Sequence, residues 1–420
     1  MSWNNAATTL VFVPPWSWKY SSEPSKIARR PSLAPPVDPA KRQKRLHKLT
    51  FSLASALRSA KFHIMTELPA AITGPSAWYG PDMAARTDWI EPLSPADISE
   101  IEAAGQRLAE REVDWQSLRH EDFPLPRLQR RLRIIIDEVL EGRGFALLRG
   151  LPVERWGRGL SAIAFLGLGL HWGSLRSQNR QGHLLGHVKD LGLTSQDPHV
   201  RIYQTRERQN YHTDSCDVVG LLCWHPARSG GLSSLLSSVT LFNEMRKGRP
   251  DLARVLFEPI ETDRRGEVPA GQKPFFSIPV FNWYAGLLST VYHRNYIESA
   301  RRFPEVPPLT PLQIEALDVF DRLAEDPALH FRMELQAGDV QLVHNHTVLH
   351  DRTAFQDWPE PERKRHLLRL WLAPQQARPL PVVFAERYGS VVPGQRGGIV
   401  VHGTRYTIAW QGEDVLRLSP

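Results

Sequence analysis

The sequence predicts a mainly β fold, with a barrel or sandwich core and helices packed outside it. Between residues 183 and 373, many short apolar runs are separated by turn residues, a spacing that is typical of these two architectures. The 34 prolines and 28 glycines among 420 residues also favour short elements over long helices. Hydrophobic residues make up 41% of the chain and charged residues 23%, which leaves ample apolar material for one large core.

The first 64 residues differ from the rest and are predicted to be an extension outside the folded domain. They carry eleven basic residues against two acidic ones, and seven prolines interrupt them. This composition is typical of a disordered extension, although a mitochondrial transit segment or a surface anchor is also basic and poor in acids. We therefore expect a cytoplasmic protein, with a mitochondrial location as the alternative. Residues 65–420 are predicted to form a single domain.

Charge and cysteine content exclude several classes of protein. Beyond residue 64, 41 basic residues face 43 acidic ones, so the folded part lacks the positive excess of a nucleic-acid-binding domain. No apolar run approaches the ~18 residues of a membrane-spanning helix. Cys216 and Cys223 are too few for a disulfide-built scaffold and are predicted to be small core residues. We expect a small-molecule partner, no nucleic acid and no membrane; the oligomeric state is open, with a homodimer among the options.

Two helices and one strand are predicted ahead of the β-rich region. Ser94 can cap the first helix, because Pro95 suits the first helical position and Asp97 places an acid in the first turn. Apolar residues at helical spacing from about Arg127 predict a second helix, which a pair of glycines ends. The apolar run Phe145–Gly150 then predicts a buried strand.

The β-rich region itself is predicted to hold eight strands and two helical interruptions. Thr310 followed by Pro311 repeats the capping pattern at the second interruption. Elsewhere, runs of apolar residues are bounded by turn residues, as strands are. The strands are expected at His183–Asp190, Val200–Gln204, Val218–Trp224, Leu232–Ser238, Phe275–Phe281, Phe331–Leu335, Asp339–His344 and His366–Ala373, and the helices at Leu241–Phe257 and Thr310–Glu325.

Histidines and one aspartate give the first chemical signal. His212 and Asp214 stand two apart just before an apolar strand, so in an extended chain their side chains point to the same face. An imidazole nitrogen and a carboxylate oxygen can then meet at one point, although an isolated His-x-Asp is more often a surface pair. A second segment, residues 338–352, runs from a turn through a strand into a histidine-rich loop. The histidines of that segment are His344, His346 and His350.

Arginines on an otherwise apolar strand give the second signal. Arg365 and Arg369 lie four residues apart and therefore share one face with Trp371, while leucines take the other face. An unpaired buried guanidinium is costly, so this face needs an anion or water beside it.

Together these segments resemble the iron(II)- and 2-oxoglutarate-dependent dioxygenases of the taurine dioxygenase / 2,4-dichlorophenoxyacetate dioxygenase family. The resemblance is strongest over residues 203–373 and extends weakly back to about Gly144. The family pattern is a His-x-Asp pair, a Gly-Gly-x-Thr/Ser strand, a distal His and then an Arg. The segments that match it in this order are His212-Thr213-Asp214, Gly230-Gly231-Leu232-Ser233, His350 and Arg365.

The resemblance implies a double-stranded β-helix (jelly roll, cupin-like) with helices outside, and an oxidoreductase. It implies Fe(II) held by His212, Asp214 and His350, with three positions left for the cosubstrate 2-oxoglutarate and for O2. Arg365 would bind the far carboxylate of 2-oxoglutarate, with Ser233 at a position where the family usually has Thr. The pattern Asn-x-x-x-x-His-x-Arg favours His350 as the distal ligand over the two histidines before it.

The usual reaction of this family hydroxylates an unactivated C–H bond and forms succinate and CO2. Arg369 matches a family position that points into the pocket. There it would either clamp an acidic group of the substrate or pair with an acid of the protein such as Asp351. The irregular stretch 173–182 is a candidate lid over the pocket. The polar residues expected in loops that cover the pocket are Gln178, Asn179 and Asn210.

The sequence leaves two other functions open. A metal-dependent hydrolase could hold zinc and an activated water on the same three side chains, but Arg365 and Ser233 would then have no purpose. A non-catalytic jelly-roll binding protein would keep the fold, but it would not need an intact triad.

Overall fold

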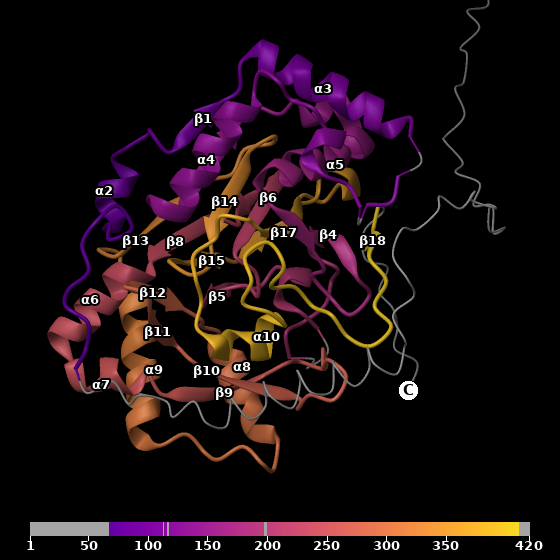
Figure 1. The fold of residues 1–420 in the computed structure, drawn as a ribbon. Helices are drawn as coiled ribbons and strands as arrows, with labels where there is room; N and C mark the ends of the chain where they lie inside the picture. Colours follow the sequence, from indigo (N-terminus) through magenta and orange to yellow (C-terminus); the bar gives the residue numbers. More distant parts are fainter. Residues whose placement is uncertain (1–66, 112, 116, 197–199, 411–420) are drawn as a thin grey trace, which may run out of the picture. The chain divides into compact units, whose positions relative to one another are not determined.

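The computed structural model describes residues 67–111, 113–115, 117–196 and 200–410. The predicted extension, residues 1–64, lies outside the described residues, so its role stays a prediction. Within these ranges the fold is mainly β sheet with helices, as predicted (Figure 1). No helix of the described part has both the length and the apolar character that crossing a bilayer requires.

The larger sheet holds eight strands among the described residues. Its order is β1-β2-β14-β6-β17-β4-β18, and β3 pairs with the end of β17. Neighbours are antiparallel from β2 through β14, β6 and β17 to β4. Its strands are β1 (Ile90–Pro92), β2 (Phe145–Arg149), β3 (Ser174–Arg176), β4 (His183–Val188), β6 (Val218–His225), β14 (Val340–His344), β17 (His366–Ala373) and β18 (Thr407–Ile408).

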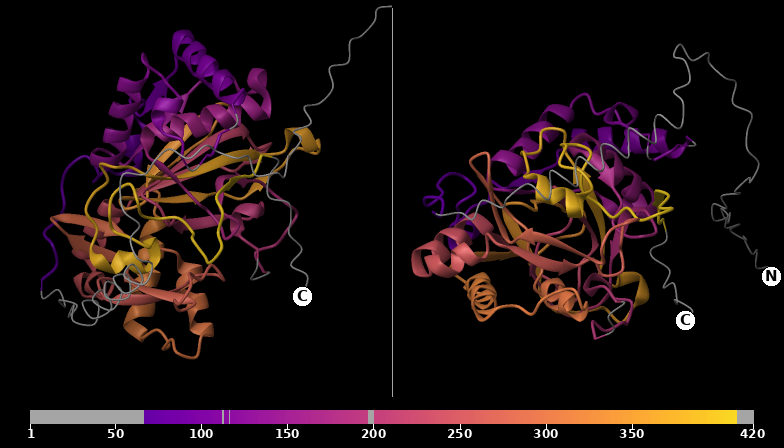
Figure 2. Two further views of the ribbon diagram at one scale, coloured as in Figure 1. Left: turned by 45° about the vertical axis from the view of Figure 1, so that its right-hand side comes forward. Right: turned by 60° about the horizontal axis from the view of Figure 1, so that its bottom comes forward.

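A smaller antiparallel sheet packs face to face with the larger one (Figure 2). Val219 and Val343 of the larger sheet belong to one apolar cluster with Leu235 and Val348 of the smaller sheet. The order of the smaller sheet is β13 (His330–Met333), β8 (Ser233–Ser237), β15 (Val348–Arg352) and β5 (Gln209–His212). Two-stranded ribbons are formed by β9 (Pro259–Asp263) with β10 (Phe275–Pro279), β11 (Phe281–Tyr284) with β12 (Leu287–Thr290), and β7 (Ser229–Gly230) with β16 (Phe355–Gln356).

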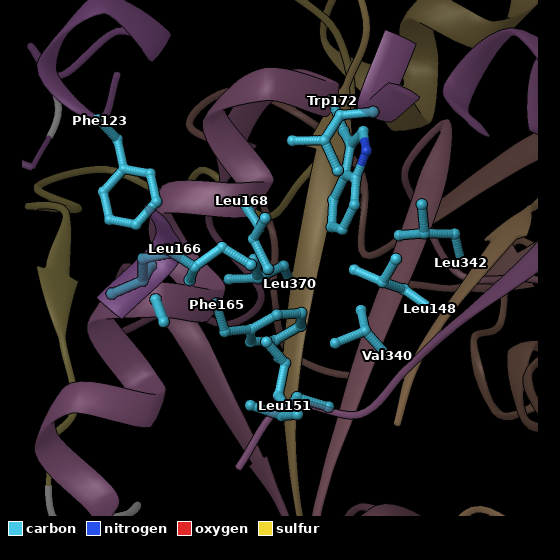
Figure 3. Close-up of a cluster of buried hydrophobic side chains, with 14 of the residues drawn as sticks. Phe123, Leu148, Leu151, Phe165, Leu166, Leu168, Trp172, Val340, Leu342 and Leu370 are labelled. Atoms are coloured by element: carbon cyan, nitrogen blue, oxygen red, sulfur yellow. The ribbon is translucent and has the colours of Figure 1, made fainter. Parts of the chain in front are cut away.

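Helices cover the outer faces of both sheets. Phe165 of α5 packs on Leu370 of the larger sheet (Figure 3), and Phe320 of α9 shares a cluster with Leu349 of the smaller one. Burying each such side chain contributes about 2 kcal/mol. The α-helices are α2 (Gly80–Ala84), α3 (Pro95–Ala109), α4 (Gln129–Glu141), α5 (Val153–Trp172), α6 (Ser238–Gly248), α7 (Pro250–Val255), α8 (Arg294–Ser299), α9 (Pro311–Ala324) and α10 (Ala385–Tyr388); short 3-10 helices span His120–Asp122, Ile202–Gln204, Ala300–Arg302, Pro361–Arg363 and Val382–Phe384.

The helix starts predicted from the caps at Ser94 and Thr310 are confirmed, and so are seven of the eight strands predicted in the β-rich region. The single helix predicted at Leu241–Phe257 is wrong: α6 begins at Ser238, and α7 is a separate helix that begins at Pro250, because proline suits a first helical position and cannot continue the helix before it. Ser94 Oγ accepts a hydrogen bond from the backbone N–H of Asp97 (3.2 Å), and the Asp97 carboxylate accepts one from the backbone N–H of Ser94 (2.9 Å). The predicted strand Val200–Gln204 is wrong. This segment forms a 3-10 turn instead, closed by the hydrogen bond from the N–H of Thr205 to the carbonyl of Ile202 (3.1 Å).

Several elements were not predicted, and α5 and β15 show why. The sequence of α5 contains several glycines, which argue against a helix, but these glycines let the helix approach its neighbours closely. A Cβ at Gly167 would lie 2.4 Å from the Phe123 ring, and one at Gly169 would lie 2.6 Å from Leu370. The expected histidine-rich loop is in large part the strand β15, because a tight turn at residues 345–347 returns the chain to the sheet.

A fully buried ion pair ties the C-terminal segment to the loop between β5 and β6. Arg396 and Asp217 are both 0% exposed, and Arg396 Nε donates to the two carboxylate oxygens of Asp217 at 2.9 and 3.0 Å. His346 Nε2 lies 2.8 Å from the same carboxylate. Burial would raise the pKa of Asp217, but the hydrogen bond from His346 and the charge of Arg396 hold it below its usual value.

Removing one partner of this pair should strongly destabilise the fold. We expect Arg396→Ala to lower the free energy of unfolding by about 3–5 kcal/mol, because it leaves an unpaired buried carboxylate. Urea denaturation of the purified variant measures this loss. The exposed Arg254 on α7 is a matched control, whose replacement by alanine should change stability by less than about 0.5 kcal/mol. An Arg396→Ala protein as stable as this control would contradict the assignment.

Candidate active site

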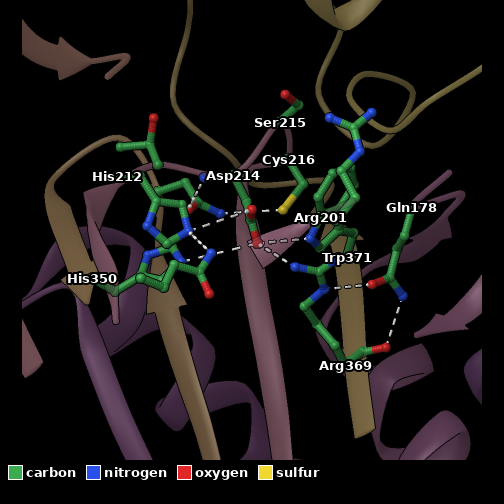
Figure 4. Close-up of polar contacts among 12 residues, drawn as sticks. Gln178, Arg201, His212, Asp214, Ser215, Cys216, His350, Arg369 and Trp371 are labelled. Carbon is green, nitrogen blue, oxygen red and sulfur yellow. Dashed lines mark hydrogen bonds and ion pairs between the residues drawn. The ribbon is translucent and has the colours of Figure 1, made fainter. Parts of the chain in front are cut away.

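The strands β5 and β15 bring the three predicted ligands together. His212 ends β5 and lies directly opposite His350 of β15 in the sheet, so the two rings point to the same face with centroids 4.2 Å apart. Asp214 follows in the next loop, where its backbone N–H donates to Asn345 Oδ1 (2.9 Å). One ligand atom from each of the three side chains lies within 4.8 Å of the other two (Figure 4).

Hydrogen bonds orient the first imidazole for ligation. His212 Nδ1 lies 2.8 Å from the Asn210 carbonyl oxygen, so Nδ1 carries the proton, as is usual for a metal-binding histidine. Its Nε2 lies 3.9 Å from Asp214 Oδ1 and accepts a hydrogen bond from the Gln209 amide (2.9 Å), which a bound metal would displace. Nε2 of His350 lies 4.0 Å from Asp214 Oδ2.

Electrostatics favour two neutral imidazoles beside one carboxylate. Burial lowers the pKa of His212 and of His350, the latter to about 3, so both rings are neutral at pH 7. Burial alone would raise the pKa of Asp214, but the adjacent Arg369 guanidinium above all holds it below its ordinary value. Two histidines and one carboxylate on a single face are the donor set that suits a ferrous ion with open positions.

Two buried arginines, Arg352 of β15 and Arg365 just before β17, contact the same aromatic ring. Arg352 follows His350 by two residues on β15 and therefore shares its face. The Arg352 and Arg365 guanidiniums lie 4.9 and 5.0 Å from the same Phe355 ring. Nη1 of Arg365, and Nε and Nη1 of Arg352, are buried without a hydrogen-bond partner among the described residues. Burial lowers the pKa of Arg365 to about 10 and, with repulsion from Arg365, that of Arg352 to about 9.

These residues fit the far carboxylate of 2-oxoglutarate. Three buried N–H groups without acceptors are costly, and a planar carboxylate can satisfy several of them. Ser233 of β8 lies opposite Arg352, and its hydroxyl donates to Gln341 Oε1 (3.0 Å). The Cα atoms of residues two apart on a strand are about 6.7 Å apart. A five-carbon dicarboxylate is long enough to span that distance between His350 and Arg352. The sequence analysis used Arg352 only as part of the pattern that favours His350, and gave it no role of its own.

The Gly-Gly pair before Ser233 makes room for Arg365. Gly231 has φ +66°, and a Cβ there would lie 2.9 Å from Arg365 Nε. We expect Gly231→Ala to displace this guanidinium and to raise the Kd for 2-oxoglutarate by on the order of tenfold or more. Calorimetric titration of the Mn(II)-loaded protein without O2 measures this Kd. Gly266→Ala is the matched control, because Gly266 also has positive φ (+78°) but nothing near its missing Cβ; equal effects of both variants would refute the packing argument.

Arg369 is tied to the triad through its own hydrogen bonds. Its Nε donates to Gln178 Oε1 (2.7 Å), and its Nη1 lies 3.5 Å from Asp214 Oδ2. Trp371 Nε1 donates to the same carboxylate oxygen (2.9 Å). Of the two alternatives for Arg369, the structure shows pairing with an acid of the protein; that acid is Asp214, whereas Asp351 pairs with Arg208.

Of the three polar residues predicted to cover the pocket, only Gln178 lines it. The stretch 173–182 is not a lid, because it contains β3 and because Gln178 and Asn179 are only 5% and 7% exposed. Gln178 lines the pocket beside the triad and holds Arg369. Asn179 instead binds the backbone N–H of His183 (3.2 Å), and the Asn210 side chain is exposed; neither lines the pocket.

A pocket opens on one side of the triad. His212 and Asp214 form part of its wall, and the cationic side chains on it are Arg201, Arg369 and Arg387. Arg201 and Arg387 were not predicted, since they lie outside the motifs and reach the pocket only through the tertiary fold.

Comparison with known proteins decides the family. A model described as "Taurine catabolism dioxygenase TauD, TfdA family" matches residues 107–371. This chain belongs to the TauD/TfdA family. As a TauD/TfdA protein it is a 2-oxoglutarate-dependent non-haem iron dioxygenase, an oxidoreductase whose family uses Fe(II), 2-oxoglutarate and O2.

Named TauD/TfdA relatives align over most of their length. The chain is 31% identical to FR-33289 synthase of Streptomyces rubellomurinus over 75% of this chain and 94% of that protein. It is 29% identical to the taurine hydroxylase-like protein SAT17 of Stachybotrys chartarum, over 73% of this chain and 81% of that one. A uridine-5'-phosphate dioxygenase of a Streptomyces species is also 29% identical, over 55% of this chain and 86% of that one.

Solved structures of similar fold include two oxygenases in complex with iron. Asparagine oxygenase in complex with Fe(II), 2S,3S-3-hydroxyasparagine and succinate superposes with a TM-score of 0.53 at 17% identity, over 68% of this chain and 93% of that one. The non-haem iron oxygenase OrfP, in complex with Fe and alpha-ketoglutaric acid, gives a TM-score of 0.52 at 16% identity, over 67% of this chain and 93% of that one. At these identities the likeness concerns the fold.

Proposed function

We propose that this dioxygenase hydroxylates an unactivated C–H bond of a small organic anion while 2-oxoglutarate is converted to succinate and CO2. The observation that carries the proposal is the convergence of His212, Asp214 and His350 beside a pocket. It is supported by the unpartnered buried donors of Arg352, which is on the same strand as His350, and of Arg365, which contacts the same Phe355 ring as Arg352. We further propose that the two facing sheets form the double-stranded β-helix of this family.

Each group of residues has a separate task in this proposal. His212, Asp214 and His350 would hold Fe(II), while Arg365, Arg352 and Ser233 would hold the far carboxylate of 2-oxoglutarate. Within the second group, Arg352 and Ser233 face each other on neighbouring strands, and Arg365 directly precedes β17. When bound, iron and 2-oxoglutarate together with O2 supply the oxidising power that turns a C–H bond into a C–OH bond.

The chain's own contribution is binding, orientation and exclusion of water. Gln178 fixes the Arg369 guanidinium, and Arg369 with Trp371 fixes the carboxylate of Asp214. The charge of Arg369 keeps that carboxylate ionised, as a ligand must be. The pocket would place one substrate C–H next to the open side of the triad.

An anionic substrate is supported by the positive side chains of the pocket. Arg201, Arg369 and Arg387 line it, against the two acids Asp214 and Glu267. Two of the relatives are named uridine-5'-phosphate dioxygenases, after a small anionic compound. A small organic anion is therefore the substrate class that we propose.

The alternatives are not favoured by the same observations. A zinc hydrolase on the triad would leave the buried donors of Arg365 and Arg352 without acceptors, at a cost in stability. A non-catalytic binding protein would not need ligand atoms from two strands and a loop to meet within 4.8 Å.

Substrate-dependent succinate formation tests the proposed function. The purified protein, supplied with Fe(II), 2-oxoglutarate and O2, is screened against small phosphonates, phosphates, sulfonates, carboxylates and neutral compounds. We expect anions to stimulate succinate release, and Zn(II) in place of Fe(II) to give none. Stimulation by neutral compounds alone would contradict the anionic substrate, and turnover with Zn(II) without 2-oxoglutarate would favour the hydrolase.

A further inference from the structure

The pocket beside the triad has more positive charge than its own acids neutralise. Its acids are Asp214, which belongs to the triad, and Glu267. Glu267 is already paired with Arg201, at 3.1 Å between its Oε2 and Arg201 Nη2. This leaves Arg369 and Arg387 as the cations that a ligand in the pocket would meet.

The two remaining arginines, Arg369 and Arg387, differ in how many of their N–H groups already have an acceptor in the protein. Arg369 gives its Nε to Gln178 and its Nη1 to Asp214, so it acts mainly as a positioning residue for the triad. Arg387 donates only from Nε, to Ser215 Oγ (2.7 Å). Among the described residues, no hydrogen bond or ion pair is found for its Nη1 and Nη2.

Arg387 is held in place by the triad loop. Its guanidinium lies 5.5 Å from the Phe276 ring, and the hydroxyl of the next residue, Tyr388, donates to the Asp214 carbonyl (3.5 Å). Ser215, which accepts from Arg387, directly follows Asp214. Burial lowers the pKa of Arg387, and the charge of Glu267 opposes that shift only in part.

Two hydroxyl groups on the same pocket wall have a proton to give. Ser215 Oγ accepts from Arg387, so its own O–H can donate to a ligand. Tyr296 accepts from Arg201 Nη1 (3.0 Å), which likewise leaves its O–H as a donor. With the two Nη groups of Arg387, these hydroxyls make four donor groups. They outnumber the two oxygens of a carboxylate and suffice for the three terminal oxygens of a tetrahedral oxyanion.

We infer that Arg387, Ser215 and Tyr296 form the binding site for a phosphonate or phosphate monoester group of the primary substrate. The inference rests on the proposed function, since the site lies in the pocket of the triad. The phosphorus group stays unchanged in the reaction. One C–H bond elsewhere in the substrate becomes C–OH, with O2 and 2-oxoglutarate consumed and succinate and CO2 released.

Binding of four compounds of matched size tests this site without turnover. The wild-type protein, loaded with Mn(II) and 2-oxoglutarate in the absence of O2, is titrated calorimetrically with propylphosphonate, propyl phosphate, propane-1-sulfonate and butanoate. We expect one or both phosphorus compounds to bind at least about tenfold more tightly than butanoate, because a dianion meets two cations. The phosphonate and phosphate arms tell which of the two groups is preferred. If neither binds more tightly than butanoate, the assignment is wrong.

Variants of Arg387 test which residue is responsible. Arg387→Gln should raise the Kd of the preferred phosphorus compound about 100-fold, while Arg387→Lys should recover part of the affinity. Ser215→Ala and Tyr296→Phe, which keep the packing, should each raise it several-fold. The exposed arginine of the control variant Arg254→Gln should leave the Kd unchanged. Unchanged Kd values in Arg387→Gln, Ser215→Ala and Tyr296→Phe would overturn the site.

The two proposals can fail separately. A wild-type protein that binds propylphosphonate through Arg387 but forms no succinate with any compound would contradict the proposed function and keep the anion site. A protein that turns over 2-oxoglutarate with carboxylate substrates, and is indifferent to Arg387→Gln, would keep the function and refute the anion site.

Discussion

Replacing His212 by alanine is expected to abolish 2-oxoglutarate decarboxylation. The imidazole would be one of only three protein ligands to the metal, and it lies opposite His350 on the neighbouring strand. Because losing a residue that merely orients a ligand costs 10–100-fold in metal affinity or activity, losing the ligand itself should cost more than about 100-fold. Succinate formation and equilibrium binding of Fe(II) under nitrogen measure the two losses.

The control for this variant is another histidine of the same chain. His402 is exposed and lies outside the pocket, so His402→Ala should keep wild-type succinate formation and Fe(II) affinity. His350→Ala should behave as His212→Ala does. Wild-type turnover in either triad variant, with a normal melting temperature, would show that the ligands have been wrongly assigned.

Replacing Arg365 by leucine is expected to weaken 2-oxoglutarate binding by about 2–5 kcal/mol, or roughly 30- to 4,000-fold in Kd. The guanidinium is 4% exposed and has an unpartnered Nη1, so its loss removes a charge-assisted contact made in a dry site. Arg352→Leu should have a similar but smaller effect, because Arg352 keeps one contact with the protein, to the Glu207 carbonyl. Calorimetry of the Mn(II)-loaded protein measures both.

The melting temperature is a second measurement on the same variants, and it should not fall although ligand binding is weakened. Without 2-oxoglutarate, Arg365→Leu should not destabilise the protein and can stabilise it, because an unpaired buried charge is replaced by an apolar side chain. The rise in melting temperature that saturating 2-oxoglutarate gives the wild type should disappear. Arg363→Leu, two residues earlier and exposed, is the control. If Arg365→Leu is strongly destabilised without ligand, this arginine is part of the framework instead.

The residues of the triad could be predicted because their chemistry is local in sequence. His212 and Asp214 are two residues apart, and the spacing after Asn345 singles out His350. The alternation of arginines and leucines along β17 was predicted for the same reason: Leu368 and Leu370 pack under the helices, while Arg369 lines the pocket.

The residues that were missed depend on packing between distant segments. Glycines weaken the helical signal of α5, and only the sheet beneath Gly169 explains why they are there. Polar residues between glycines favour a loop, which is why a lid is predicted around Gln178. In the structure the Gln178 amide is buried, and it forms hydrogen bonds with both the side chain and the backbone carbonyl of Arg369. Arg387 lies 18 residues after Arg369 in sequence, outside every motif.

The anchoring of Arg396 to Asp217 has a consequence for how the protein is made. The backbone N–H of Gly398 also donates to the Ser215 carbonyl (2.8 Å), so the loop that carries Asp214 is completed by residues near the end of the chain. A ribosome that has synthesised all the strands of the two facing sheets up to β17 still holds a nascent polypeptide whose Asp217 lacks its counter-ion. The loop that carries Asp214 can therefore settle only after residues 396–398 have been translated.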